Sequence, residues 1–248
     1  MSEPPEPFVL AGRRPVLELL RSGRAPERVL IAQGLAPSSV LGQIRRRAEA
    51  AAAPVRTVPK AELDRLAGGL NHQGVVALTA RYRYAPLEEL LAGVKPCLLF
   101  LDGITDPHNL GSLLRSADGA GFDGAVIPTH RSATVTAAVR RVSAGAAEMV
   151  PVARVPNLAH AVDRARIAGL WVLGLDAGAE ADIWSSTLAE PPVGIVLGSE
   201  DRGISHNLRE HCDALVRIPL GGALASLNVA VAGALAMFEV RRRSAPAP

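Results

Sequence analysis

The sequence has few cysteines and lacks the short motifs that identify several classes of enzyme and metal-binding protein. It has only two cysteines, Cys97 and Cys212, and neither lies in a CxxC pair, which argues against a disulfide framework or a thiolate metal site and favours a reducing cytoplasm. No P-loop, HExxH motif or GxSxG elbow occurs. Residues 1–7 lack the basic and then apolar order of a signal peptide. We therefore expect a cytoplasmic protein without a bound metal.

Long apolar runs are also scarce, and only one of them needs to be tested as a membrane span. Residues 221–238 form an uncharged run of 18 residues, which reaches the length at which a spanning helix is considered. The run is rich in alanine and includes three glycines, a serine and an asparagine. A helix buried on all sides within a folded domain is the better prediction, so no membrane contact is expected.

Charge is unevenly distributed along the chain. The formal net charge is +3, but residues 1–84 carry 13 Lys and Arg against 7 Asp and Glu, and the remainder carries 14 against 17. A basic front half is typical of a surface that faces a polyanion. With 248 residues, of which 48% are hydrophobic, the chain is long enough for two domains with real cores.

The hydrophobic pattern predicts a small α/β domain over residues 1–84. Helical spacing occurs at residues 16–20, at 41, 44 and 48, and at 61–66. Strands are expected at 29–31, 55–58 and 74–80. Residues 85–96, with prolines near both ends, are expected to link this domain to a second one.

The second domain, residues 97–248, is expected to be an α/β domain with a mostly parallel sheet. Continuous apolar runs predict strands covered on both faces at 97–101, 125–127, 151–153, 170–175, 193–197 and 214–218. Helical patterns lie between most of these runs. They predict helices on both faces of the sheet.

The loops that follow these strands are the candidate site, because ligands bind beyond the carboxyl ends of parallel strands. The first loop contains Asn109, and Arg115 lies off the apolar face of the helix that follows. Pro107 and Asn109 can equally start and cap this helix, with Arg115 an ordinary surface charge.

Two later loops strengthen the prediction of a site. The loop after strand 193–197 places Glu200 between Gly198 and Gly203, and glycines there permit close approach of the backbone to a ligand. The loop after strand 214–218 leads to Ser226 and Asn228, just before the long apolar helix. These two polar residues can cap that helix, and as polar groups at a buried segment they need partners.

Together the three loops resemble the three motifs of the SPOUT methyltransferases, in their SpoU/TrmH branch of RNA 2′-O-methyltransferases. Motif one corresponds to residues 106–111 with Arg115, motif two to residues 197–203, and motif three to residues 218–220 and 226–229. Residues 12–20 and 71–75 resemble the substrate-binding domain of the branch that methylates a guanosine of 23S rRNA. The resemblance covers nearly the whole chain.

The resemblance implies a fold that periodicity does not reveal. It implies a deep trefoil knot, in which the segment with motif three threads through an earlier loop, and a homodimer with each active site near the subunit interface. It also implies methyl transfer from S-adenosylmethionine to a ribose 2′-hydroxyl in structured RNA, with 23S rRNA or its precursor as the first choice. A tRNA methyltransferase, an antibiotic-resistance rRNA methyltransferase, and a non-catalytic RNA-binding or ribosome-assembly factor are the alternatives.

The resemblance also assigns roles to particular residues. The backbone around Leu197, Gly198, Ile218, Leu220 and Leu227 is expected to hold the cofactor. The expected catalytic set has Asn109 and Arg115 on the ribose and phosphate, Glu200 and Ser226 orienting Arg115 and the nucleotide, and Asn228 supporting the pocket. The family's usual proposal makes the arginine the general base. Because a guanidinium is not deprotonated in proteins, Arg115 can instead position the phosphate and stabilise the developing alkoxide.

A strip of arginines in the front domain supplies candidate phosphate contacts with RNA: Arg13, Arg14, Arg21, Arg24, Arg45, Arg46 and Arg47. Arginine runs on helices are also commonly solvated faces. Aromatic residues make up only 3% of the chain, so recognition is expected to depend on RNA shape, phosphates and 2′-hydroxyls more than on base stacking.

Overall fold

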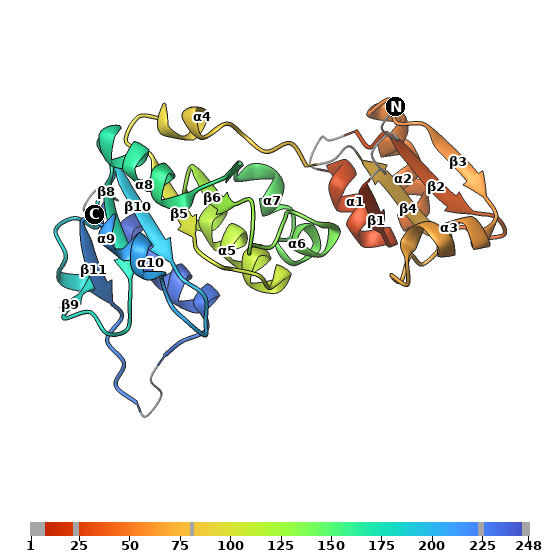
Figure 1. The fold of residues 1–248 in the computed structure, drawn as a ribbon. Coiled ribbons are helices and arrows are strands. Elements are labelled where there is room, and N and C mark those ends of the chain that lie inside the picture. The colour runs from red at the N-terminus through yellow and green to blue at the C-terminus, as the bar shows by residue number, and fades with distance from the viewer. Residues whose placement is uncertain (1–7, 22–24, 80–81, 223–225, 245–248) are drawn as a thin grey trace. The chain divides into compact units, whose positions relative to one another are not determined.

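The computed structural model describes residues 8–21, 25–79, 82–222 and 226–244. The chain divides into two compact units, Met1–Arg83 and Tyr84–Pro248, each with its own sheet (Figure 1). Residues 85–96, which we expected to link two domains, belong to the second unit and include α4 (Leu87–Leu91).

The sheet of the first unit has four strands in the order β1-β4-β2-β3. Their bounds are Phe8–Ala11 for β1, Arg28–Ala32 for β2, Val55–Val58 for β3 and Val75–Thr79 for β4. Strands β2 and β3 are parallel, whereas β4 is antiparallel to β1 and β2. We did not predict β1, because its four apolar residues show no alternation and become a strand only by pairing with β4, far along the chain.

Each face of this sheet has its own core. Val29 and Ile31 pack with α1 (Arg13–Arg21) and α2 (Ser39–Ala50), while Leu30 and Ala32 pack with α3 (Lys60–Ala67). Successive residues of a strand point to opposite faces, so one short strand contributes to both cores. All five residues of β4 are buried, as expected for a strand covered on both sides.

The sheet of the second unit has seven strands in the order β7-β6-β5-β10-β8-β11-β9, and all of its pairs are parallel. The predicted parallel α/β domain is therefore confirmed. The two-residue strand β9 was too short for the pattern to indicate. The strand bounds are Cys97–Leu101 (β5), Gly124–Pro128 (β6), Val152–Val155 (β7), Trp171–Leu175 (β8), Ala181–Asp182 (β9), Val193–Leu197 (β10) and Ala214–Arg217 (β11).

Helices cover both faces of this sheet (Figure 1). On one face, α4, α8 (Leu158–Ile167) and α9 (His206–Glu210) share a core with Leu98, Phe100 and Val196. On the other, α5 (Pro107–Ala120) packs against α10 (Val229–Ser244), with α6 (Ala137–Val142) and α7 (Ala146–Met149) beside it. A Cβ at Gly233 would lie 2.5 Å from Leu113 and 2.7 Å from Leu197, so α10 approaches both α5 and β10 closely.

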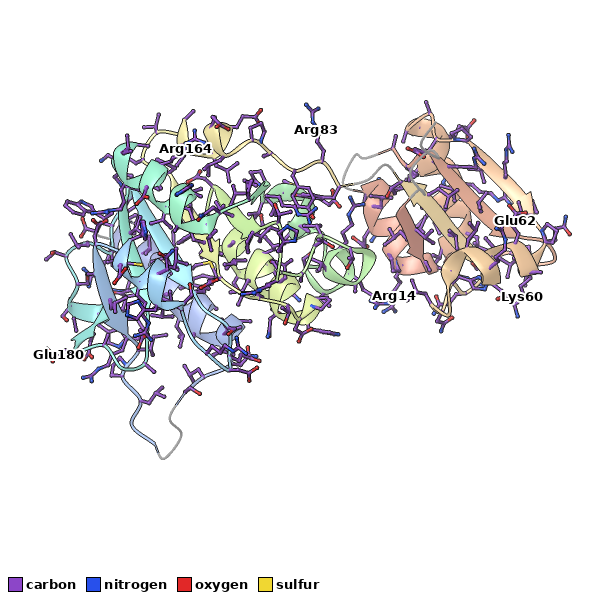
Figure 2. The ribbon with its side chains drawn as sticks, in the orientation of Figure 1. Arg14, Lys60, Glu62, Arg83, Arg164 and Glu180 are labelled. Carbon is purple, nitrogen blue, oxygen red and sulfur yellow. The ribbon has the colours of Figure 1, made fainter. Side chains whose placement is uncertain are left out.

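Apolar contacts explain why α4 belongs to the second unit. Leu87 and Leu90 are buried in the core that α8 covers, and a Cβ at Gly124 would lie 2.6 Å from Leu90. Arg164 of α8 also forms an ion pair of 2.7 Å with Glu88 of α4, and Figure 2 labels Arg164 at this junction. Because both charged side chains are largely exposed, the ion pair adds little to stability. Burial of the two leucines therefore holds α4 against the rest of the second unit.

Helix α10 contains the end of the apolar run of the sequence, and the expectation that it is buried on all sides is wrong. Its buried face includes Gly233, Ala236 and Met237, whereas Val231, Leu235 and Phe238 are 49%, 40% and 49% exposed. The sheet and α5 cover only one side of the helix, which leaves an apolar stripe uncovered by the described chain. Among the described residues, no helix is both long enough and apolar enough to cross a membrane.

The carboxyl end of α10 is anchored by a buried acid. Glu239 is 6% exposed and pairs with Arg242 and Arg243. The hydrogen bond from Arg242 is the main cause that lowers the pKa of Glu239 below its usual value. Arg243 also donates to the backbone carbonyls of Ser186 and Trp184, in and after the short helix η1 (Ile183–Ser185). These bonds hold the helix that begins with motif three.

Candidate active site

Three of the loops that follow neighbouring strands enclose a pocket of about 290 Å³. The strands are β8, β10 and β11, which lie side by side in the sheet, and the start of α10 closes the remaining wall. The lining includes the residues predicted to hold the cofactor, Leu197, Gly198, Ile218, Leu220 and Leu227. It also includes Glu200 and Ser226. The pocket therefore lies beyond the carboxyl ends of parallel strands, where ligands are expected to bind.

The loop with motif two is a tight hairpin. The N–H of Ser199 donates to the carbonyl of Gly203 at 3.1 Å, and the N–H of Gly203 donates back to Ser199 at 2.8 Å. Gly203 has φ +64°, a left-handed conformation that favours glycine. The hairpin folds back on Gly198, where a Cβ would lie 1.9 Å from the carbonyl carbon of Gly203. Only glycine fits at position 198 in this arrangement.

The loop with motif one is tied to this hairpin. The N–H of Asp102 donates to the carbonyl of Leu197 at 2.8 Å, and the Asp102 carboxylate accepts from the N–H of Ser205 at 2.8 Å. Strands β5 and β10 are parallel neighbours, so their loops begin at the same edge. The loops with motifs one and two are thus held together by one backbone hydrogen bond and one hydrogen bond to the Asp102 side chain, before any ligand is considered.

Asp106, and not Asn109, caps α5. The carboxylate of Asp106 accepts from the N–H of His108 at 2.8 Å, and Pro107 occupies the first turn. The side chain of Asn109 is therefore available for another contact. Its Oδ1 accepts from Nδ2 of Asn228 at 3.0 Å, which joins motif one to motif three.

Asn228 connects all three motifs. Its Nδ2 donates to Asn109 and to the Glu200 carboxylate, while its Oδ1 accepts from the N–H groups of Ala230 and Val231. The N–H of Val229 also donates to Glu200 at 3.4 Å. One amide thus caps α10 and joins the loops with motifs one and two, so Asn228 is both the helix cap and the partnered polar group that the sequence suggested.

Arg115 stands apart from this network. It is exposed on α5 and does not line the pocket. Across the residues that the structure describes, it forms no hydrogen bond or ion pair, and Glu200 bonds Asn228 and Val229 in place of Arg115. The guanidinium is consequently available for a group that comes from outside the chain.

Sequence reasoning missed the charged pair in the pocket wall. Asp176 follows β8 directly and forms an ion pair with Arg209 of α9. Both residues line the pocket. The rule that selected the other loops would have found Asp176, because it also follows an apolar strand. Arg209 has no such signal, since only tertiary structure brings α9 to this edge.

The two cysteines take no part in the pocket. Burial raises the pKa of Cys97 to about 12, with a further rise from Asp123, and burial likewise raises that of Cys212 to about 12, with a contribution from Asp213. Both thiols are therefore protonated at neutral pH and are poor nucleophiles. The polar groups that line the pocket are carboxylates, guanidinium groups and serine hydroxyls.

The arginines of the predicted RNA-binding strip have different surroundings. Arg13 donates from Nε to the carbonyl of Gln73 at 3.0 Å, and Arg21 pairs with Glu18 at 2.7 Å. Arg14, labelled in Figure 2, is exposed on α1, and Arg24 lies outside the described residues. The remaining three members are exposed on α2: Arg45, Arg46 and Arg47.

Two family models match the two parts of the chain. A model of the SpoU rRNA methylase family matches residues 96–238. A model for RNA 2′-O ribose methyltransferase substrate binding matches residues 9–85. The first match contains every motif loop described above. The second covers nearly all of the basic front unit.

Individual relatives match both parts together. A protein of Staphylococcus haemolyticus (strain JCSC1435), named for the TrmH family of tRNA/rRNA methyltransferases, is 40% identical over 243 residues, 96% of each chain. The AdoMet-bound rRNA methyltransferase from Sinorhizobium meliloti has a TM-score of 0.78 and 26% identity, covering 97% of this chain and 89% of that one. The SpoU methyltransferase AviRb from Streptomyces viridochromogenes has a TM-score of 0.78 and 26% identity, covering 96% and 90%.

Proposed function

This chain belongs to the SpoU rRNA methylase family and is an S-adenosylmethionine-dependent RNA 2′-O-ribose methyltransferase, and we propose that its substrate is a guanosine of 23S rRNA. The observation that favours a catalyst is the contact network of Asn228, which joins Asn109 to Glu200, a residue of the pocket lining. A non-catalytic assembly factor of this fold would not need these side chains. The Sinorhizobium meliloti protein, which is named an rRNA methyltransferase, matches both units and supports rRNA over tRNA.

The pocket suits a ligand that is part apolar and part charged. Leu197, Ile218 and Leu227 supply apolar walls, and Leu220 is 39% exposed, so a bound purine has apolar surface to cover. Asp176 and Glu200 supply carboxylates for hydroxyl groups and positive charge. The volume of about 290 Å³ lies at the lower end of the usual range for small-molecule pockets. S-adenosylmethionine supplies an electrophilic methyl group on a sulfonium sulfur.

We assign the alignment of the acceptor and the stabilisation of its charge to residues of this chain. The reaction needs an aligned 2′-oxygen, removal of the hydroxyl proton and exclusion of water. Asn109 contacts the ribose, and Arg115 binds the adjacent phosphate and stabilises charge as it develops on the oxygen. Asn228 holds Glu200 and Asn109 in place. Because a guanidinium keeps its proton, we propose that Arg115 positions the acceptor and that the hydroxyl proton passes to a solvent water as the bond between the oxygen and the methyl group forms.

We further propose that the active form is a homodimer and that a second copy covers the apolar stripe on α10. Val231, Leu235 and Phe238 recur at helical spacing on one face and are each at least 40% exposed. A contiguous apolar stripe of this kind marks an interaction surface. It also begins one turn from Asn228, so a partner seated there would lie next to the active site.

Mapping of 2′-O-methyl groups in total RNA from cells with and without this protein tests the substrate. We expect one mark in 23S rRNA to disappear in the cells that lack the protein. Loss of a mark in tRNA alone would transfer the assignment to tRNA. If no mark changes, and the purified protein shows no uptake of S-adenosylmethionine by calorimetry, the proposed function is wrong.

A further inference from the structure

The first unit has a polar groove that the proposed reaction does not use. It lies where β1, β2 and β3 end and β4 begins, so it is at the carboxyl edge of three of the four strands. The groove encloses about 810 Å³. Its polar lining is Arg13, Gln33, Lys60, Asp64 and the turn of residues 71–74.

The turn is built around a buried histidine. His72 is 7% exposed, and its Nδ1 accepts from the N–H of Gly74 at 3.1 Å. The ring hydrogen is therefore on Nε2, which donates to the carboxylate of Asp64 at 2.8 Å. Both ring nitrogens are used within the protein. His72 thus fixes the turn and leaves the side chains on either side of it, Asn71 and Gln73, exposed to the groove.

The backbone of this turn is held in an uncommon conformation. Gln73 has φ +49°, which is uncommon for a residue other than glycine. Gly74 follows with φ +79°, and a Cβ there would lie 2.5 Å from Leu35. Arg13 donates to the carbonyl of Gln73 at 3.0 Å. Such strain persists only where surrounding contacts impose it, and it is concentrated at functional sites.

The groove offers donors and acceptors without aromatic stacking surfaces. Three side-chain amides, of Gln33, Asn71 and Gln73, line it, and no Phe, Tyr or Trp is among its described lining residues. An amide presents a donor and an acceptor together, which matches the edge of a nucleic-acid base. Arg13 and Lys60 supply positive charge, and Figure 2 labels Lys60 at the start of α3.

We propose that this groove holds one unpaired nucleotide of the RNA substrate, with its base edge against the amides and its phosphate near Arg13 and Lys60. Bases in paired A-form RNA are poorly accessible to side chains, whereas unpaired bases expose their hydrogen-bonding edges. The groove is therefore a specificity site for an unpaired base. This inference rests on the proposed function, because it takes RNA as the substrate.

Binding of the full chain to two matched RNA probes tests the proposal. One probe is a stem closed by an unpaired loop, and the other is the same stem as a fully paired duplex. The variants are Gln33→Ala, Asn71→Ala and Lys60→Ala. Arg65→Ala is the matched control, because Arg65 is exposed on the same helix as Lys60 but does not line the groove.

We expect Gln33→Ala and Asn71→Ala each to weaken binding of the looped probe by about tenfold and to leave duplex binding nearly unchanged. Lys60→Ala should weaken both and reduce the dependence of log affinity on log salt by about one. Arg65→Ala should change looped-probe affinity by less than about twofold. A loop with 4-thiouridine should photo-cross-link to the tryptic peptide of residues 66–81, which contains the turn.

Two results would contradict the role proposed for the groove without contradicting the methyltransferase activity. One is wild-type affinity of the amide variants for the looped probe, with no cross-link in residues 66–81. The other is an equal loss of affinity for loop and duplex, which would mean phosphate contact alone. Calorimetry with S-adenosylmethionine distinguishes failure of the groove proposal from failure of the proposed function, since the groove variants should bind the cofactor normally.

Discussion

At the scale of the residue, Gly198 and Gly221 differ in whether the structure has room for a side chain. A Cβ at Gly198 would collide with backbone atoms of Gly203 and Ile204, the nearest at 1.9 Å, whereas a Cβ at Gly221 meets nothing within 4 Å. Gly198 lines the pocket and Gly221 does not. The hairpin of motif two therefore depends on the missing side chain of Gly198.

Gly198→Ala should lower the affinity for S-adenosylmethionine by at least about tenfold, because the backbone that would have to move forms the pocket wall. Titration calorimetry measures this directly. Gly221→Ala is the control and should bind like the wild type. Full affinity of Gly198→Ala would show that the hairpin does not form the cofactor site.

Arg115→Lys should reduce the methylation rate by about a hundredfold or more, because lysine keeps the charge but loses the planar fork that binds phosphate. Cofactor affinity should not change, since Arg115 does not line the pocket. Arg164→Lys, on α8, is the control and should retain full activity. Near-normal turnover of Arg115→Lys would exclude the role assigned to this arginine.

At the scale of the element, α10 links stability to the site because its N-cap is a residue of motif three. Asn228 accepts from two N–H groups of the first turn with Oδ1, and its Nδ2 donates to Asn109 and Glu200. The oxygen and the nitrogen of the Asn228 amide thus have different functions. A helix cap stabilises the fold, whereas the bonds to Asn109 and Glu200 position the site.

Asn228→Ala should lower the free energy of unfolding by about 1 kcal/mol, the usual cost of removing a cap, and should also reduce turnover. Asn228→Ser restores a capping oxygen but provides no amide for Asn109 and Glu200. We expect the serine variant to recover stability in chemical denaturation without recovering turnover. Recovery of both would mean that Asn228 acts on the site only through helix stability.

At the scale of the whole molecule, the exposed stripe on α10 predicts self-association. Leu235→Lys places a charge in the stripe and should shift the protein from dimer to monomer in analytical ultracentrifugation, with loss of activity. Val94→Lys is the control, because Val94 is 97% exposed and lies outside the stripe. A wild-type chain that sediments as a monomer at all concentrations would contradict the homodimer.

The basic front unit predicts a salt-dependent affinity for RNA. Replacing Arg45, Arg46 and Arg47 together by alanine should weaken RNA binding and reduce the slope of log affinity against log salt by up to about three, because each phosphate that a side chain neutralises adds about one to the slope. Filter binding at several salt concentrations measures the slope. An unchanged slope would identify these arginines as a solvated helix face.

Much of the second unit was predictable because its strands are buried on both faces. Such strands appear in the sequence as continuous apolar runs, and the polar loops that follow them are the site by a general rule of parallel sheets. Asn109, Glu200, Ser226 and Asn228 were found in this way, and the motif resemblance supplied their chemistry. Strands β1 and β9 were missed because they are short and depend on distant pairing partners.

The type of most of the longer elements, the loops that contain the site residues and the family were all predictable from the sequence. Local spacing and residue type contain that information, since both act within a few residues of each other. Which side chains meet depends on the folded chain: Asn228 contacts Asn109 and Glu200, Arg209 contacts Asp176, and His72 contacts Asp64. The exposed face of α10 likewise follows from the folded chain, because the burial of a residue depends on neighbours that folding brings from far along the sequence.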